Sequence, residues 1–223
     1  METLVTYAVG GAAARLTLDS PHNRNALSAA LVRQLHDGLR RAAADPAVRA
    51  VVLTHTGNTF CAGADLSESS GGDPFEAAVD RARELTALLR AIVDCPIPVI
   101  AAIDGHVRAG GLGLVGACDI AVAGPRSTFA LTEARIGVAP AIISLTLLPK
   151  LAPRAAARYF VTAETFTADR AAEIGLVTLA AEDVGFAVDA LIGELGKASP
   201  QGLAASKALT TAAIRAGFDR DAE

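Results

Sequence analysis

The sequence predicts an α/β fold, in which helices cover the faces of β-sheets, because strand-like and helix-like segments alternate along it. Residues 49–56 (RAVVLTHT) and 98–104 (PVIAAID) are short, nearly continuous apolar runs, which are typical of buried parallel strands. Between them, residues 75–93 repeat their apolar side chains at the spacing of an amphipathic helix. This order of strand, helix and strand is the pattern expected of an α/β protein.

The N-terminal segment is predicted to form a hairpin followed by a helix. Residues 3–9 and 13–18 alternate loosely between apolar and polar side chains, with a glycine pair between them that favours a turn. Ser28 carries the hydroxyl expected of a helix N-cap, and leucines then recur on one face as far as about Ala44. The small residues at 57–66 predict a turn after the strand that follows.

The rest of the chain continues the alternation and then becomes mainly helical. A glycine-containing helix is expected from about residue 109, with short strands after it at 119–124 and 128–131. One further short strand is expected at 176–180. Beyond Pro140 the helical pattern dominates, and the expected helices span 140–149, 153–162, 168–174, 183–197 and a final stretch that starts at about 199.

Size and charge fit one globular domain without a nucleic-acid partner. The chain has 223 residues, of which 52% are hydrophobic, enough for one sizeable core. We expect a single domain over 1–223, with a core over about 1–150 and a helical C-terminal part over about 151–223. The net charge is −4, and no basic block exceeds the pair Arg40-Arg41, so the basic surface of a nucleic-acid binder is missing.

The sequence predicts a cytoplasmic protein without a membrane partner or a metal. The N-terminus lacks the charged and apolar regions of a signal peptide, and the apolar run at 97–103 is too short to span a bilayer. The three cysteines, Cys61, Cys95 and Cys118, lack metal-ligand spacing and read as small buried residues of a reducing compartment. The four histidines are scattered, so no metal site is expected.

The glycines of HVRAGGLGLVGACDI (106–120) need an explanation, because glycine inside a helix costs about 0.5–1 kcal/mol relative to alanine. Close packing or backbone N–H groups offered to a ligand would explain them. A second turn of small residues, TFCAGADL (59–66), also follows an apolar strand. Two such turns side by side, one of them opening a helix, present convergent N–H groups, as an oxyanion hole does. The spacing alone leaves both explanations open. It fits neither a dinucleotide fingerprint nor a Walker loop.

Four segments together resemble the signature segments of the enoyl-CoA hydratase/isomerase (crotonase) family. In chain order they are SPHNRNALS, FCAGADL, DGHVRAGGLGLVGACDIAVAG and FALTEARIGVAP, and the likeness extends over roughly residues 5–210. The resemblance implies a crotonase-like spiral of ββα units with a C-terminal helical lobe. It also implies an acyl-CoA thioester substrate in fatty acid metabolism, a homotrimer or hexamer, and no bound cofactor, since coenzyme A is part of the substrate. The chain stops short of the usual family length, and the resemblance implies that the further stretch helps to cover the active site.

Matching motif to motif, the resemblance implies a role for individual residues. The backbone N–H groups of Ala64 and Gly110 fall on the two oxyanion donors, and Glu133 falls on a catalytic acid/base. Arg24 either meets a coenzyme A phosphate or is a solvated surface arginine. The positions expected to bind the coenzyme A or acyl part of the substrate are Asn23, Arg24, Ala26, Ala62, Asp65, Leu66, Gly111 and Ala141.

This chain departs from the family pattern at one catalytic position. Hydratases of the family usually carry a second glutamate three residues beyond the oxyanion glycine, and here that residue is Gly113. Burial of Glu133 behind an apolar strand is expected to raise its pKa and make it a better base. The alternative is a surface glutamate paired with Arg135. We interpret Asp119 as a structural residue, and the apolar residues at 141–144 either shape the acyl pocket or simply pack.

Three functions stay open on this basis. The first is an enoyl-CoA hydratase, a lyase that adds water across the 2,3 double bond with the enolate held in an oxyanion hole and Glu133 as acid/base. The second is a double-bond isomerase, in which Glu133 carries a proton between C2 and C4. The third is a non-catalytic acyl-CoA-binding protein. In this case the chain would have lost catalytic activity because Gly113 stands where the family usually has its second glutamate.

Overall fold

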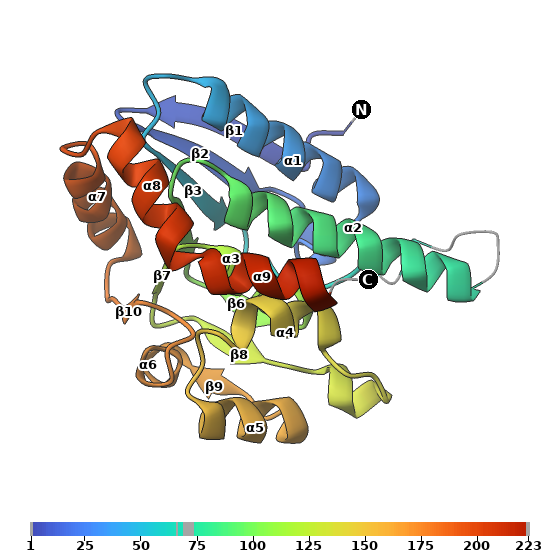
Figure 1. Ribbon diagram of the computed structural model, residues 1–223. Coiled ribbons are helices and arrows are strands. Elements are labelled where there is room, and N and C mark those ends of the chain that lie inside the picture. Colours follow the sequence, from blue (N-terminus) through green and yellow to red (C-terminus); the bar gives the residue numbers. More distant parts are fainter. Residues whose placement is uncertain (1, 66, 69–73, 222–223) are drawn as a thin grey trace.

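The computed structural model describes residues 2–65, 67–68 and 74–221, and these residues form two β-sheets with helices packed on them (Figure 1). In the larger sheet β1 and β2 form an antiparallel hairpin, and the other neighbouring strands run parallel. Its strands, in spatial order, are β1 (Val5–Gly10), β2 (Ala13–Leu18), β3 (Ala50–His55), β5 (Val99–Ile103), β7 (Ile120–Ala123) and β10 (Leu179–Ala180). The predicted α/β class is therefore confirmed.

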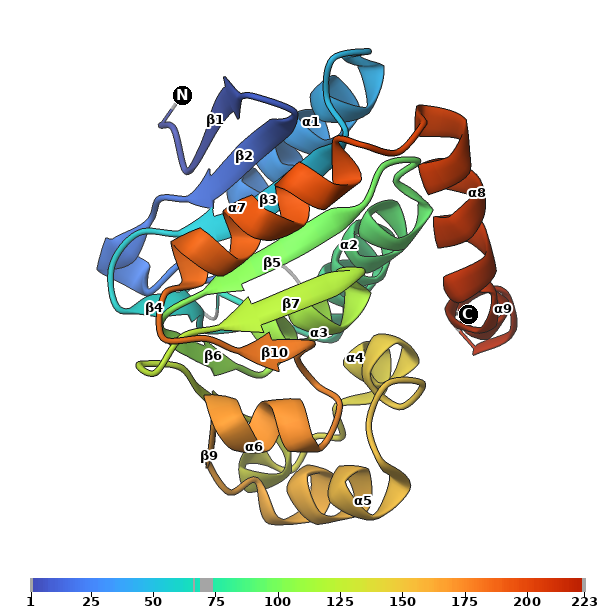
Figure 2. The same ribbon diagram turned by 90° about the vertical axis from the view of Figure 1, so that its left-hand side faces the viewer.

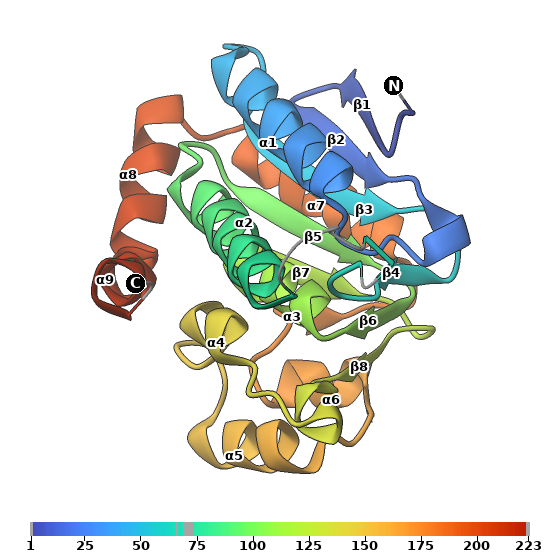
Figure 3. The same ribbon diagram turned by 90° about the vertical axis from the view of Figure 1, so that its right-hand side faces the viewer.

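Helices cover both faces of the larger sheet, which explains its apolar strands. One face carries α1 (Ala29–Ala44), α2 (Pro74–Asp94) and α3 (Gly110–Ala117), and α7 (Val184–Leu195) crosses the other (Figures 2 and 3). The predicted cap of α1 is confirmed, because the Ser28 hydroxyl accepts a hydrogen bond from the Leu31 N–H at 3.2 Å.

The smaller sheet consists of very short strands in the order β4-β6-β8-β9. These strands are β4 (Thr59–Cys61), β6 (His106–Arg108), β8 (Thr128–Ala130) and β9 (Phe166–Thr167). Strands β3, β5 and β7 of the larger sheet are each followed by one strand of the smaller sheet and then by a helical segment. This repeat is the expected spiral of ββα units. The prediction of a plain turn at 57–66 was wrong in one respect, because that segment includes β4.

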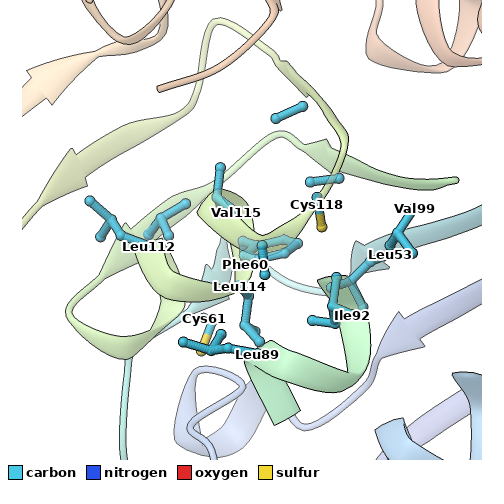
Figure 4. Close-up of a cluster of buried hydrophobic side chains, with 14 of the residues drawn as sticks. Leu53, Phe60, Cys61, Leu89, Ile92, Val99, Leu112, Leu114, Val115 and Cys118 are labelled. Atoms are coloured by element: carbon cyan, nitrogen blue, oxygen red, sulfur yellow. The ribbon is translucent and has the colours of Figure 1, made fainter. Parts of the chain in front are cut away.

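Phe60, in β4, anchors the smaller sheet to the core of the larger one. Its side chain is fully buried, and Figure 4 shows it among apolar side chains from β3, α2, β5 and α3. The labelled side chains around it are Leu53, Cys61, Leu89, Ile92, Val99, Leu112, Leu114, Val115 and Cys118. This packing holds the segment after β4 at a fixed place beside the start of α3.

The chain after β8 is mainly helical, as predicted. Two short 3₁₀ turns, η1 (Pro21–Asn23) and η2 (Glu133–Ile136), follow β2 and β8. The remaining helices are α4 (Ala141–Leu147), α5 (Pro153–Thr162), α6 (Ala168–Glu173), α8 (Pro200–Thr210) and α9 (Ala212–Asp221). Two ion pairs tie α9 to α2, from Arg90 to Asp219 at 2.7 Å and from Arg215 to Asp94 at 3.0 Å. Within the described ranges, no helix combines the length and the apolar character needed to cross a bilayer.

Candidate active site

The two small-residue turns of the sequence lie against each other. A β carbon added at Gly63 would lie 2.9 Å from the Ala109 Cβ and 3.3 Å from the Gly110 nitrogen. Gly63 also has a φ of +93°, in the region that favours glycine. A β carbon at Gly111 would lie 2.7 Å from the carbonyl oxygen of Cys61. Glycine is therefore required on both sides of this junction, because any side chain would push the segment after β4 away from α3.

Two backbone N–H groups at the junction have no hydrogen-bond partner in the described part of the chain. Among the described residues, neither the N–H of Ala64 nor the N–H of Gly110 donates a hydrogen bond. The N–H of Asp65, by contrast, donates to the Leu27 carbonyl at 3.3 Å. Gly110 is the first residue of α3, where N–H groups have no partner within the helix and the helix dipole is positive. The junction therefore offers two free donors.

Close packing explains some of the glycines in α3 but not all of them. Gly111, Gly113 and Gly116 each lie so close to a neighbouring segment that a β carbon would come within 3.0 Å of it. At Gly110 the nearest atom would be the Leu27 Cδ1 at 3.4 Å, an ordinary contact. Close packing therefore explains three of these glycines and leaves Gly110 unexplained. Gly111, predicted to bind substrate, packs against β4.

A cavity of about 360 Å³ opens beside the two free N–H groups. Its walls come from the segment after β4, from α2, from the start of α3 and from the chain between η2 and α4. The predicted site residues that line it are Ala62, Ala64, Gly110, Glu133 and Ala141. Its size and mostly apolar lining are those of a small-molecule site.

Glu133 brings a carboxyl group to this cavity. It is the first residue of η2, three residues after the end of β8, and its Oε2 atom is buried without a hydrogen-bond partner among the described residues. Burial raises the pKa of the Glu133 carboxyl group above its ordinary value, as expected. The alternative of a pair with Arg135 was wrong, because the Arg135 guanidinium donates to the Ala163 carbonyl at 2.8 Å.

The two segments expected to bind coenzyme A are hydrogen-bonded to each other. The Ala62 N–H donates to the Arg24 carbonyl at 3.1 Å, and the Leu27 N–H donates to the Gly63 carbonyl at 2.8 Å. Ala26 is buried between these bonds, whereas the Arg24 side chain is exposed. The main chain thus brings residues distant in sequence into one rim beside the cavity.

Asn23 and Asp65 join the same rim through their side chains. The Asn23 amide donates to Asp65 Oδ2 at 3.0 Å, and the Ser67 hydroxyl and N–H both donate to Asp65 Oδ1. The bonds from Ser67 lower the pKa of the Asp65 carboxyl group, so this acid stays ionised. Leu66, the remaining predicted contact, lies outside the described residues.

Asn25 shapes this rim and was not predicted. It is fully buried with a φ of +54°, a conformation that asparagine tolerates better than most residues. Its carbonyl oxygen accepts from the Ser20 N–H at 2.7 Å, and its amide donates to the Thr59 carbonyl at 2.7 Å. The second asparagine of the NRN run was the available signal. The sequence did not indicate which residue turned inward.

Comparison with known proteins shows the family of this chain. A family model described as Enoyl-CoA hydratase/isomerase matches residues 9–220. The chain belongs to the enoyl-CoA hydratase/isomerase family. A solved enoyl-CoA hydratase from Mycobacterium avium is 70% identical, with a TM-score of 0.93 over 100% of this chain and 87% of that one. An enoyl-CoA hydratase from Mycobacterium smegmatis is 30% identical, with a TM-score of 0.89 over 98% of this chain and 89% of that one.

A curated relative gives the same family. The enoyl-CoA hydratase AKT6-1 of Alternaria alternata is 34% identical over 210 residues, which are 93% of this chain and 69% of the relative. The resemblance read from the four sequence segments is therefore confirmed, and so is the crotonase-like fold.

This family member has no room for a side chain at Gly113. A β carbon there would lie 2.5 Å from the Ile143 Cγ2 atom and 3.2 Å from the Leu89 Cδ1 atom. Ile143 is itself buried and lines the cavity. The space beside Gly113 is therefore filled by an apolar side chain from α4, and among the described lining residues Glu133 is the single carboxylate.

Proposed function

We propose that this family member is an enoyl-CoA hydratase that adds water across the 2,3 double bond of an enoyl-CoA thioester. One observation carries the proposal: Glu133, whose Oε2 atom is buried without a partner among the described residues, lines the same cavity as the Ala64 and Gly110 residues with their free N–H groups. Enolate chemistry needs this combination, because negative charge on the thioester oxygen must be held while a proton moves at the neighbouring carbon.

In the proposed reaction the thioester oxygen accepts hydrogen bonds from the Ala64 and Gly110 N–H groups. Each such donor is worth roughly 3 kcal/mol in comparable acyl chemistry. Glu133 takes a proton from a water molecule as the water oxygen bonds to C3, and the double-bond electrons move onto the thioester as an enolate. Glu133 then returns the proton to C2, so that the product is the 3-hydroxyacyl-CoA.

The coenzyme A part of the substrate is proposed to lie along the rim formed by the segments at 23–26 and 62–65. The exposed Arg24 side chain suits a phosphate of coenzyme A as an ionic partner. The proposal includes no cofactor beyond the substrate's own coenzyme A. A homotrimer or hexamer and a place in fatty acid metabolism belong to it through the family resemblance alone, and a cytoplasmic location belongs to it through the cysteine pattern of the sequence.

A second candidate function, double-bond isomerisation, is favoured by the packing at Gly113. With Ile143 filling that space, the described lining of the cavity has no second carboxylate to hold an attacking water molecule. Moving a proton from C4 to C2 of a 3-enoyl-CoA needs the oxyanion donors and one carboxylate only. Glu133 alone would serve as that carboxylate.

A spectroscopic assay separates these functions. The purified protein is incubated with a short trans-2-enoyl-CoA, and the absorbance of the conjugated thioester is followed. The experiment is repeated with the 3-enoyl isomer. Loss of absorbance in the first reaction supports the hydratase, whereas a gain confined to the second supports the isomerase. Binding of the thioesters without change in either reaction would contradict both functions and support a non-catalytic binder.

A further inference from the structure

One cationic side chain lines the candidate active-site cavity. Of the described lining residues, only Arg81 carries a positive charge. It lies on α2 on the same face as Ala78, Ala82 and Leu85, since residues three and four apart in a helix are neighbours. Leu85 reaches the start of α3, because its Cδ2 atom would lie 3.5 Å from a β carbon at Gly110. Arg81 therefore lies about one helical turn along α2 from Leu85, the residue that contacts the start of α3.

Arg81 has no anionic partner in the described part of the chain. No ion pair or side-chain hydrogen bond involves it, although its side chain is only partly exposed. Arg83, two residues further along, donates to Asp80 at 3.2 Å and is 73% exposed. A guanidinium group has five N–H donors and loses hydration when it is partly withdrawn from water. Arg81 thus has unused donors at an apolar cavity wall.

We infer that Arg81 binds a carboxylate at the far end of the substrate's acyl chain, so that the preferred substrates are coenzyme A thioesters of dicarboxylic enoyl acids. The inference rests on the proposed function, because it assumes that the thioester lies at Ala64 and Gly110 with the acyl chain in the cavity. A guanidinium group matches a carboxylate with two parallel hydrogen bonds. The neighbouring wall residues Ala78 and Ala82 are small and leave the guanidinium group accessible.

A phosphate of coenzyme A is the other anion present in such a complex. The rim that suits coenzyme A is built from segments around Arg24 and Ala62, joined by main-chain hydrogen bonds. Arg81 belongs instead to the wall that α2 contributes, and α4 contributes Ile143 to the same cavity. This placement favours the acyl end of the substrate over its phosphates.

The first test measures kcat/KM for the wild type, Arg81→Met and the matched control Arg83→Met. The substrates are a trans-2-enoyl-CoA with a methyl end and a series of trans-2-enoyl-CoAs with a terminal carboxylate at increasing chain length. We expect the wild type to prefer a member of the carboxylate series. Arg81→Met should lose roughly 10- to 100-fold on that substrate alone, the range of a hydrogen bond to a charged group. Arg83→Met should leave kcat/KM unchanged on both types of substrate. An equal loss on both substrate types would overturn the inference.

The second test measures binding by calorimetry and does not require turnover. The ligands are free coenzyme A, a saturated acyl-CoA with a methyl end and its counterpart with a terminal carboxylate. We expect Arg81→Met to weaken only the last of these. Equal weakening of free coenzyme A would assign Arg81 to a phosphate, and equal wild-type affinity for the two acyl-CoAs would exclude carboxylate recognition. Absence of turnover with every enoyl-CoA would count against the proposed function alone, because the calorimetric comparison still decides the role of Arg81.

Discussion

The Nζ atom of Lys207 lies 2.7 Å from Oδ2 of Asp119, which joins α8 to the start of β7. Lys207 is 4% exposed, and its ammonium group also donates to the carbonyls of Ile92 at 2.9 Å and Ile97 at 3.2 Å. The same Asp119 oxygen accepts the Val99 N–H at 2.7 Å. These contacts confirm the interpretation of Asp119 as a structural residue, because its carboxylate holds together β5, β7 and a C-terminal helix.

Lys207→Met is expected to lower the free energy of unfolding by about 3–5 kcal/mol, because it leaves the Asp119 carboxylate buried without its cation. The other oxygen of Asp119 already lacks a hydrogen-bond partner among the described residues, and the ammonium group of Lys150, a second cation near Asp119, donates to the Cys118 carbonyl instead. Chemical denaturation measures the change. The control is Lys197→Met, which breaks an exposed pair with Glu194 and should cost less than about 1 kcal/mol. Equal costs for the two variants would show that the buried pair contributes nothing special.

The strands and helices around the larger sheet were predictable because long apolar runs and helical periodicity leave clear patterns. Of the two- and three-residue strands of the smaller sheet, only β8 was predicted, as the strand at 128–131. A strand as short as β4 shows no alternation, and its pairing with β6 depends on how the spiral closes. The burial of Lys207 was not predictable either, because a single lysine in a helix is normally expected at the surface. Only the packing of α8 places it in the interior.

The candidate site was predictable where it depends on motif order and not where it depends on packing. The positions of Ala64, Gly110 and Glu133 followed from their motifs, and the structure brings all three to one cavity. That Ile143 fills the space beside Gly113 follows from the contact between α4 and α3, which no sequence pattern encodes. Arg81 was missed for the same reason, because only the orientation of α2 turns it toward the cavity.

Glu133→Gln is expected to lower kcat by roughly 10²- to 10⁴-fold, the usual contribution of a positioned acid/base. The amide keeps the size of the carboxyl group but does not take up a proton. Affinity for a saturated acyl-CoA, measured by calorimetry, should stay near the wild-type value. Glu182→Gln, an exposed substitution of the same kind, serves as the control. Full activity of Glu133→Gln would remove this residue from the mechanism.

The pH dependence of kcat/KM should report the raised pKa of Glu133. Glu133 must be ionised to accept a proton, so activity is expected to fall as the pH drops through that pKa. Since burial raises the pKa, the acid limb should lie above the value of about 4.3 for an unperturbed glutamate. Initial rates at low substrate concentration across acidic and neutral pH give the midpoint. A midpoint at or below the ordinary value would contradict the buried setting of the carboxyl group.

The same burial predicts that Glu133 destabilises the fold when it is ionised. When folding raises the pKa of an acid, the protonated acid contributes to stability at a pH below its pKa in the unfolded chain. That contribution is lost as the pH rises through its pKa in the folded protein. Glu133→Gln should therefore have a higher Tm than the wild type at neutral pH. The difference should disappear at a pH below the ordinary glutamate value, where the wild-type carboxyl group is protonated too. Thermal unfolding at several pH values tests this, and a difference that is independent of pH would point to another cause.

Gly113→Glu is expected to destabilise the protein without improving hydration. A β carbon at Gly113 would lie 2.5 Å from Ile143, so the substitution overpacks the contact between α3 and α4, which costs about 1–3 kcal/mol before the buried charge is counted. Replacing Ile143 with alanine in the same chain vacates that space. The double variant should therefore lose less free energy of unfolding than the two single variants lose together. Only in the double variant should the added carboxylate be able to raise the hydration rate.

The wild type, both single variants and the double variant form a double-mutant cycle, which measures the coupling between positions 113 and 143. Each protein is compared by thermal unfolding and by the absorbance assay. Gly193→Glu is the matched control, since no atom lies within 4 Å of a β carbon at that position of α7. It should not lower the free energy of unfolding, because it replaces an exposed glycine within a helix. If Gly113→Glu proved as stable as this control, the contact with Ile143 would not be what excludes a second carboxylate. The absence of the usual second glutamate at position 113 would then need an explanation other than packing.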